Sequence, residues 1–202
     1  PVVAVYSSFL QRAYDQILHD VCIQKLPVFF CVDRAGLVGA DGETHQGLFD
    51  ISYLSSIPNL LLMAPKNRYE MEDMMHFAME YDGPAAMRYP RGEASEVLSD
   101  CRPPIEIGRS EKIRDGKEVV LLSVGNMMDE AVKALELLKE QGISAGLVNV
   151  RFLRPIDEEM LHELAERYPL LVTLEENVLS GGYGEAVSAF LHRNGYASRL
   201  LT

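Results

Sequence analysis

Two stretches of the sequence, 33–47 and 88–92, contain residue types that can bind phosphate or transfer protons. In the glycine-rich stretch 33–47, Asp41 and His45 lie four residues apart. An imidazole can transfer a proton near neutral pH, and a neighbouring carboxylate can orient it. Arg34 in this stretch and Arg91 further along carry planar guanidinium groups, which bind a phosphate monoester through paired hydrogen bonds. These residues indicate a site for a small phosphorylated molecule.

A series of alternating strands and helices would position these residues. Apolar runs predict strands at 1–6, 28–32, 60–64 and 85–89, and helical spacing predicts helices at 8–24 and about 67–81. Alternation of this kind favours a parallel sheet with helices on both faces. Polar segments then follow three carboxyl ends of strands, where open parallel sheets bind ligands. We therefore expect segments 6–12, 33–47 and 88–92 to meet at one opening.

The second half of the chain repeats the alternation. It predicts strands at 119–124, 144–150, 170–174 and 197–202, with helices at 129–141, 157–167 and 183–193. A polar stretch containing Pro103 and Pro104 precedes it and is typical of a linker. The predicted fold class is α/β, with two three-layer α/β/α domains. Their expected bounds are residues 1–98 and 118–202, joined by a linker at 99–117.

Composition narrows the classes of function. The net charge of -11 argues against a nucleic-acid surface, because phosphate backbones require clustered Lys and Arg. No apolar run approaches the roughly 20 residues that a membrane span needs. The three cysteines follow no zinc pattern and favour reduced thiols in a cytoplasmic protein. Strand-like runs at both termini suggest that both ends are cut or incomplete.

The candidate residues also have ordinary interpretations. Asp41-Gly42 fits a simple turn, and His45 fits a solvated surface group. Arg91 could cap a helix or pair with a surface acid, and Phe9 in an apolar helical stripe would normally belong to the core. Residue types alone therefore indicate an α/β protein with a phosphate site as one possibility among others.

Longer motifs give a sharper identification. They are YSSFLQRAYDQ at 6–16, DRAGLVGADG at 33–42, THQG at 44–47, RYPRG at 88–92, VRFLRPID at 150–157 and EEN at 175–177. In this order, they resemble the 1-deoxy-D-xylulose 5-phosphate synthase family of the transketolase superfamily, over essentially the whole chain. The resemblance implies a pyrimidine-binding domain with a mostly parallel sheet, followed by a transketolase C-terminal-like domain, both truncated.

The resemblance also implies a function. The family uses thiamine diphosphate with Mg²⁺ to condense pyruvate with D-glyceraldehyde 3-phosphate, with loss of carbon dioxide. Phe9 is expected to stack on the aminopyrimidine ring of the cofactor, with Tyr6 and Arg12 nearby. The substrate phosphate is expected at two guanidinium groups, those of Arg34 and Arg91. The proton transfers are expected at Asp41 and His45.

Two features of the family do not occur in this sequence. They are a glutamate that hydrogen-bonds the aminopyrimidine ring and a Gly-Asp-Gly motif followed by Asn that binds Mg²⁺ and diphosphate. No metal ligand is therefore assigned here, and the chain alone is expected to be inactive. Since the C-terminal domain of the family supports dimer contacts, the complete protein is expected to be a homodimer. The alternatives are a transketolase-like enzyme acting on other sugars and a non-catalytic dimerisation or assembly module.

Overall fold

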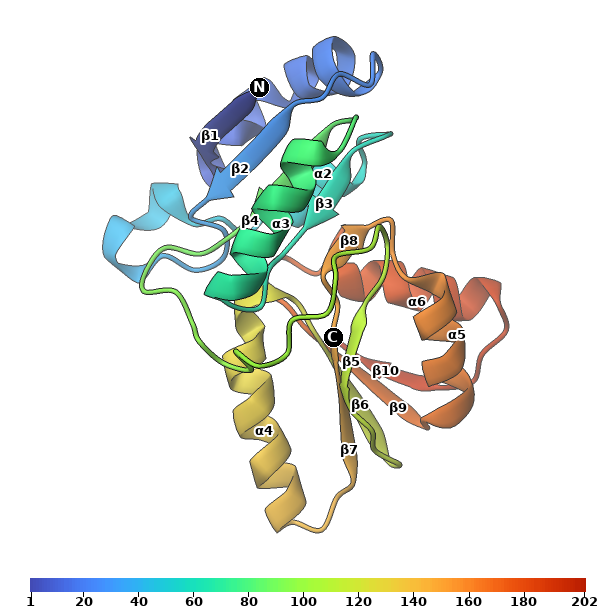
Figure 1. The fold of residues 1–202 in the computed structure, drawn as a ribbon. Helices are drawn as coiled ribbons and strands as arrows, with labels where there is room; N and C mark the ends of the chain where they lie inside the picture. Colours follow the sequence, from blue (N-terminus) through green and yellow to red (C-terminus); the bar gives the residue numbers. More distant parts are fainter.

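The computed structural model describes all residues from Pro1 to Thr202 and contains two five-stranded sheets, one centred in each half of the chain (Figure 1). The first sheet has the order β1-β2-β4-β3-β8. Its strands are β1 (Val2–Tyr6), β2 (Phe29–Asp33), β3 (Leu61–Met63), β4 (Ala85–Arg88) and β8 (Phe152–Arg154). Strands β1 to β4 are parallel, whereas β8 comes from the second half and pairs antiparallel with β3.

The second sheet has the order β10-β9-β6-β7-β5. Its strands are β5 (Glu111–Arg114), β6 (Val119–Ser123), β7 (Ala145–Asn149), β9 (Leu170–Leu174) and β10 (Arg199–Leu201). Only β5 runs antiparallel to its neighbour, β7. The predicted α/β fold with two mainly parallel sheets is confirmed.

Helices connect most of the parallel strands. They are α1 (Ser7–Leu10), α2 (Asp50–Ser55), α3 (Arg68–Glu80), α4 (Met128–Glu140), α5 (Glu158–Arg167) and α6 (Tyr183–Arg193). The helix predicted at 8–24 changes pitch, because a 3-10 turn (Gln11–Ala13) and a π-helical segment (Gln16–Cys22) follow α1. Asn67 caps α3, since its side chain accepts a hydrogen bond from the Glu70 amide. Asp157 caps α5 in the same way.

Three elements differ from the sequence prediction. The stretch predicted to be a linker contains β5, whose charged residues suit an edge strand but form no apolar run. Strand β8 has three residues, too few to show a period, and helix α2 is a short segment of six. Each of these elements depends on pairing or packing with a distant part of the chain.

The two halves share a hydrophobic core. One apolar cluster of 28 buried residues includes Leu62 of the first sheet, Val120 of the second and Phe190 of α6. Burial of such side chains stabilises by roughly 1.5–3 kcal/mol each. The halves are therefore packed against each other and do not depend on a tether alone.

A buried group of charged side chains, here called the junction cluster, also joins the halves. Its members are Lys66, Glu70, Glu111 and Arg151, with the Asn149 amide between them. The Lys66 ammonium donates to Glu111 at 2.6 Å and to Glu70 at 3.3 Å. Arg151 Nε donates to Glu70 at 2.7 Å. Because these residues come from both halves, the cluster fixes one half to the other.

Candidate functional site

Three polar segments leave the first sheet at the same edge. Tyr6 ends β1 beside Asp33, which ends β2, and Val32 pairs with Arg88, which ends β4. The glycine-rich stretch follows β2 as the light-blue loop in Figure 1. The strand order therefore brings together all three segments that the sequence singled out.

The first segment supplies an aromatic wall. The rings of Tyr6 and Phe9 stack with centroids 5.6 Å apart, and the His45 ring meets Phe9 edge-on at 5.1 Å. The Arg12 guanidinium lies 5.5 Å from the Phe9 centroid. Phe9 is 37% exposed although it is a large apolar residue, so it is not the core residue that its helical spacing allowed. Its ring is open to a flat ligand at ordinary stacking distances.

Two arginines and one aspartate form a second part of the site, here called the rim cluster: Arg34, Asp41 and Arg91. Both guanidinium groups donate to the Asp41 carboxylate. Arg34 also donates to the Tyr6 hydroxyl at 2.9 Å and lies over the Tyr6 ring at 4.2 Å. The Tyr6 hydrogen bond and the Asp41 charge raise the pKa of Arg34. The rim cluster thus carries two positive charges and one negative charge.

One donor in the rim cluster has no partner. The Nε atom of Arg34 is buried and makes no hydrogen bond within the chain. A buried N–H without a partner costs about 1–3 kcal/mol, and such groups are rare in folded proteins. Because protein atoms cover Nε, an acceptor would reach it only after the Arg34 side chain moves.

The backbone of the glycine-rich loop is closed by a pair of glycines. The Gly36 amide donates to the Gly47 carbonyl at 2.7 Å, and the Gly47 amide donates back at 2.9 Å. Gly36 has φ +82°, and a Cβ at Gly47 would lie 2.2 Å from the Arg34 carbonyl oxygen. Both positions therefore require glycine. We call this pair the loop neck.

Within the loop, His45 and Asp41 are held by different partners. Thr44 Oγ1 lies 2.9 Å from His45 Nδ1, whereas Asp41 binds the two arginines. The interpretation that the carboxylate orients the imidazole is therefore wrong in this structure. Asp41 orients the guanidinium groups instead.

Sequence reasoning missed the residues that support the site from behind. The buried Arg88 donates from Nε to Asp50 at 2.6 Å and from Nη2 to the Glu176 carbonyl at 3.1 Å. Arg88 lies in the RYPRG motif and Glu176 in the EEN motif, but no local pattern indicates their contact, and EEN is more typical of a turn. Its role appears only once the two halves are packed.

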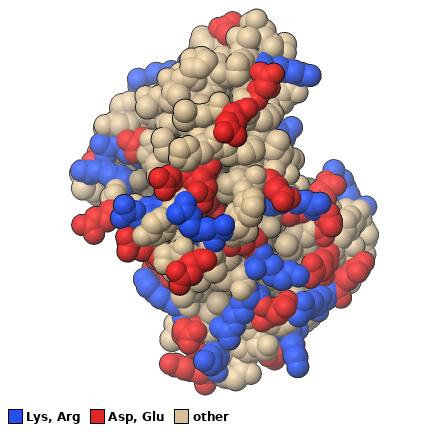
Figure 2. All heavy atoms as spheres, viewed as in Figure 1, with Lys and Arg blue, Asp and Glu red and all other residues tan.

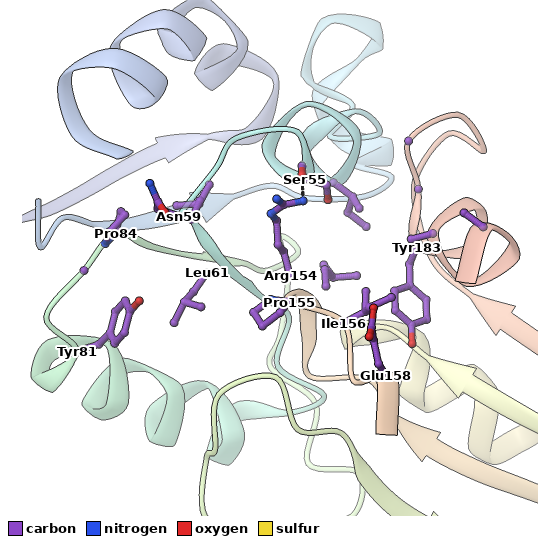
Figure 3. Close-up of a pocket in the computed structure, with 18 of the residues that line it drawn as sticks. Ser55, Asn59, Leu61, Tyr81, Pro84, Arg154, Pro155, Ile156, Glu158 and Tyr183 are labelled. Carbon is purple, nitrogen blue, oxygen red and sulfur yellow. Dashed lines mark hydrogen bonds between the residues drawn. The ribbon is translucent and has the colours of Figure 1, made fainter. Parts of the chain in front are cut away.

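Two cavities lie in the molecule at different distances from the site, and the site borders the smaller, polar one. A cavity of about 370 Å³ is bordered by Asp33, Tyr89 and Arg91. A larger cavity, about 770 Å³, lies at the amino ends of β3 and β4, between the halves. Figure 3 shows Leu61 and Tyr183 on its walls. None of the seven candidate residues lines this larger cavity.

Three further observations concern the rest of the molecule. On the face in Figure 2, acidic and basic side chains are interspersed over the second half, and the first half shows few charges. None of the helices combines the length and apolar character that a membrane crossing requires. No group of three or more His, Cys, Asp or Glu side chains is arranged to hold a metal ion.

Models of protein families match nearly the whole chain. The model of the transketolase pyrimidine-binding domain matches residues 1–96, and that of the transketolase C-terminal domain matches residues 108–200.

Several curated relatives share one name. The chain is 55% identical over 196 residues to 1-deoxy-D-xylulose-5-phosphate synthase of Lachnoclostridium phytofermentans, covering 97% of this chain and 31% of that protein. The enzyme of Synechocystis sp. is 55% identical over 197 residues, covering 96% and 31%. The chain therefore spans about a third of the length of the curated relatives it matches.

Solved structures agree with this result. A structure described as a split gene transketolase, an inactive beta4 tetramer, is 31% identical with a TM-score of 0.90, covering 100% of this chain and 65% of that chain. Transketolase from Campylobacter jejuni shares the fold, with a TM-score of 0.70 at 18% identity, covering 94% of this chain and 30% of that one. The chain belongs to the transketolase family and is similar, within it, to the 1-deoxy-D-xylulose-5-phosphate synthases.

Proposed function

We propose that this chain is part of a thiamine-diphosphate-dependent transferase that condenses pyruvate with D-glyceraldehyde 3-phosphate. The products are 1-deoxy-D-xylulose 5-phosphate and carbon dioxide. The observation that carries the proposal is the meeting of an exposed aromatic face, two guanidinium groups and an imidazole at one opening. The activity is proposed for the whole protein, since the chain spans 31% of the relatives' length.

The aromatic wall fits the cofactor's pyrimidine ring. Phe9 has an exposed ring, and Tyr6 stacks on it and keeps it in place. Phe9 and Tyr6 would hold the pyrimidine, with Arg12 beside them. When bound, thiamine diphosphate supplies the carbanion chemistry of the reaction. We propose that Mg²⁺ and the diphosphate are held outside these 202 residues.

The rim cluster fits the phosphate of the aldehyde substrate. A phosphate monoester carries close to two negative charges near neutral pH, and the cluster has one positive charge in excess. Arg91 is 46% exposed and bonds within the chain only through Nη1, so its other N–H groups are left to donate to a phosphate oxygen. Asp41 holds both guanidinium groups before the substrate arrives, which lowers the entropic cost of binding.

His45 is placed to move protons beside the wall. Its ring meets Phe9 edge-on at 5.1 Å, close to where the pyrimidine would stack. Thr44 holds Nδ1, which leaves Nε2 free to donate or accept a proton at the substrate. Asp41 would contact the substrate hydroxyls from the rim cluster.

The complete protein should be tested directly. We expect it to consume pyruvate, release carbon dioxide and form 1-deoxy-D-xylulose 5-phosphate, identified by mass spectrometry, with thiamine diphosphate and Mg²⁺ present. A ketose phosphate donor offered in place of pyruvate should give no product. Turnover of the ketose without turnover of pyruvate would contradict the proposal and favour a different transketolase activity. We also propose a homodimer, which light scattering of the complete protein can measure.

A further inference from the structure

The second half of the chain reaches the candidate site through Glu176, which follows β9. Its carboxylate lies directly against the loop neck. A Cβ built at Gly36 would be 2.2 Å from Glu176 Oε2 and 2.9 Å from its Cδ. No side chain larger than hydrogen fits between them, so the two are in direct contact.

Glu176 is fixed at two points. Its Oε2 accepts a hydrogen bond of 2.6 Å from Asn126 Nδ2, in the turn before α4. Its backbone carbonyl accepts from Arg88 Nη2 at 3.1 Å, and Arg88 is itself held by the buried Asp50. No cation forms an ion pair with the Glu176 carboxylate, so the Asn126 amide sets its position.

The loop neck in turn positions three residues of the site. Arg34 lies two residues before Gly36, and Asp41 and His45 lie in the loop that the neck closes. Inside the loop, the Gln46 side chain donates to the carbonyls of Val38 and Gly42 at 2.9 and 2.8 Å, so the loop is held as one unit. A shift at the neck would therefore move the imidazole and Asp41 together, and a displacement of about 1 Å at a reacting centre can cost a hundredfold in rate.

We propose that Glu176, held by Asn126, is a positioning residue of the first half's site. Neither residue belongs to the rim cluster or the aromatic wall, so the pair acts through the loop neck. The kinetic part of this inference rests on the proposed function. The structural part, that the Asn126–Glu176 hydrogen bond holds the neck, does not.

The test uses an exchange of the two groups in the full-length protein. Asn126→Asp places two carboxylates where an amide now meets a carboxylate, and their repulsion should push Glu176 from the neck. The double variant Asn126→Asp with Glu176→Gln restores an amide–carboxylate hydrogen bond, in which the amide at position 176 now donates and the carboxylate at position 126 accepts. Glu140→Gln, at the exposed end of α4, is the matched control.

Two readouts separate positioning from general stability. For Asn126→Asp we expect kcat to fall about tenfold or more at an unchanged dissociation constant for thiamine diphosphate, with recovery in the double variant. Hydrogen exchange of the peptide 36–47 should be about tenfold faster in Asn126→Asp and return toward wild type in the double variant.

The outcomes are distinguishable. If the wild-type protein makes no 1-deoxy-D-xylulose 5-phosphate, the proposed function fails, and the exchange measurement still decides whether the pair holds the neck. Unchanged exchange in Asn126→Asp, or a double variant as impaired as the single one, would overturn the positioning role.

Discussion

The junction cluster and the rim cluster use the same side-chain chemistry in opposite ways. In the junction cluster, two cations and two carboxylates are at most 7% exposed and bond to one another. In the rim cluster, two cations share one carboxylate, Arg91 is 46% exposed, and Arg34 Nε has no partner. The first is closed and balanced in charge, which suits structure. The second is open and has an excess positive charge, which suits an anionic ligand.

The largest expected effect comes from breaking the junction cluster. Lys66→Met leaves Glu70 and Glu111 buried with Arg151 as their only shared cation. Removing one partner of a buried charge network costs about 3–5 kcal/mol. Chemical denaturation of the full-length protein should show this loss in the free energy of unfolding. Lys139→Met, which removes an exposed lysine, is the control, and equal stability of the two variants would contradict the structural role.

The next largest effect is expected in the open site of the first half. His45→Ala should lower kcat by about a hundredfold, the lower range for a general acid or base. The affinity for thiamine diphosphate should stay within a factor of about two, because Phe9 and Tyr6 form the stacking wall. Steady-state kinetics and calorimetry of the full-length protein measure the two quantities. Collapse of cofactor affinity would mean that His45 belongs to the cofactor site instead.

A smaller effect is expected at the edge of the rim cluster. Arg91→Ala should raise the KM for D-glyceraldehyde 3-phosphate by roughly tenfold or more, because a charge-assisted hydrogen bond contributes about 1.5–3 kcal/mol. The KM for pyruvate should change little. Arg193→Ala, an exposed arginine on α6, is the control. If both variants have the same KM for the aldehyde, Arg91 does not contact its phosphate.

A separate effect, on the pH dependence of stability, concerns burial of a titratable group in the core. Burial raises the pKa of Cys22 from 9.0 to about 11. The thiol ionises first in the unfolded state, so its contribution is fully present below pH 9 and is lost as pH rises toward 11. The free energy of unfolding should therefore fall less steeply between pH 9 and 11 in Cys22→Ala than in wild type. Identical slopes would show that the thiol does not titrate differently on unfolding.

The strands and the loops that follow them were predictable because apolar runs and glycine-rich polar segments are local signals. The segments that follow β1, β2 and β4 lie at one edge because these strands are parallel neighbours. The sequence motifs had indicated the same segments. The prediction that Asp41 orients His45 was wrong because a separation of four residues brings two side chains together only in a regular helix. The loop contains separate 3-10 turns at Gly39–Asp41 and Glu43–His45.

Contacts between the halves were not predictable from the sequence. Lys66 and Glu111 are 45 residues apart, and Arg88 and Glu176 are 88 apart, so no spacing rule relates them. The charged residues of β5 looked like part of a linker because their partner strand, β7, follows later in the chain. Such pairs are selected by tertiary packing, which local patterns do not encode.

The account depends most on the rim cluster as a receptor for phosphate. The direct measurement is the ratio of kcat/KM for D-glyceraldehyde 3-phosphate to that for unphosphorylated D-glyceraldehyde, in the full-length wild type and in Arg34→Ala with Arg91→Ala. Loss of both guanidinium groups should lower this ratio by about a hundredfold or more. A ratio that stays at the wild-type value in the double variant would contradict the account.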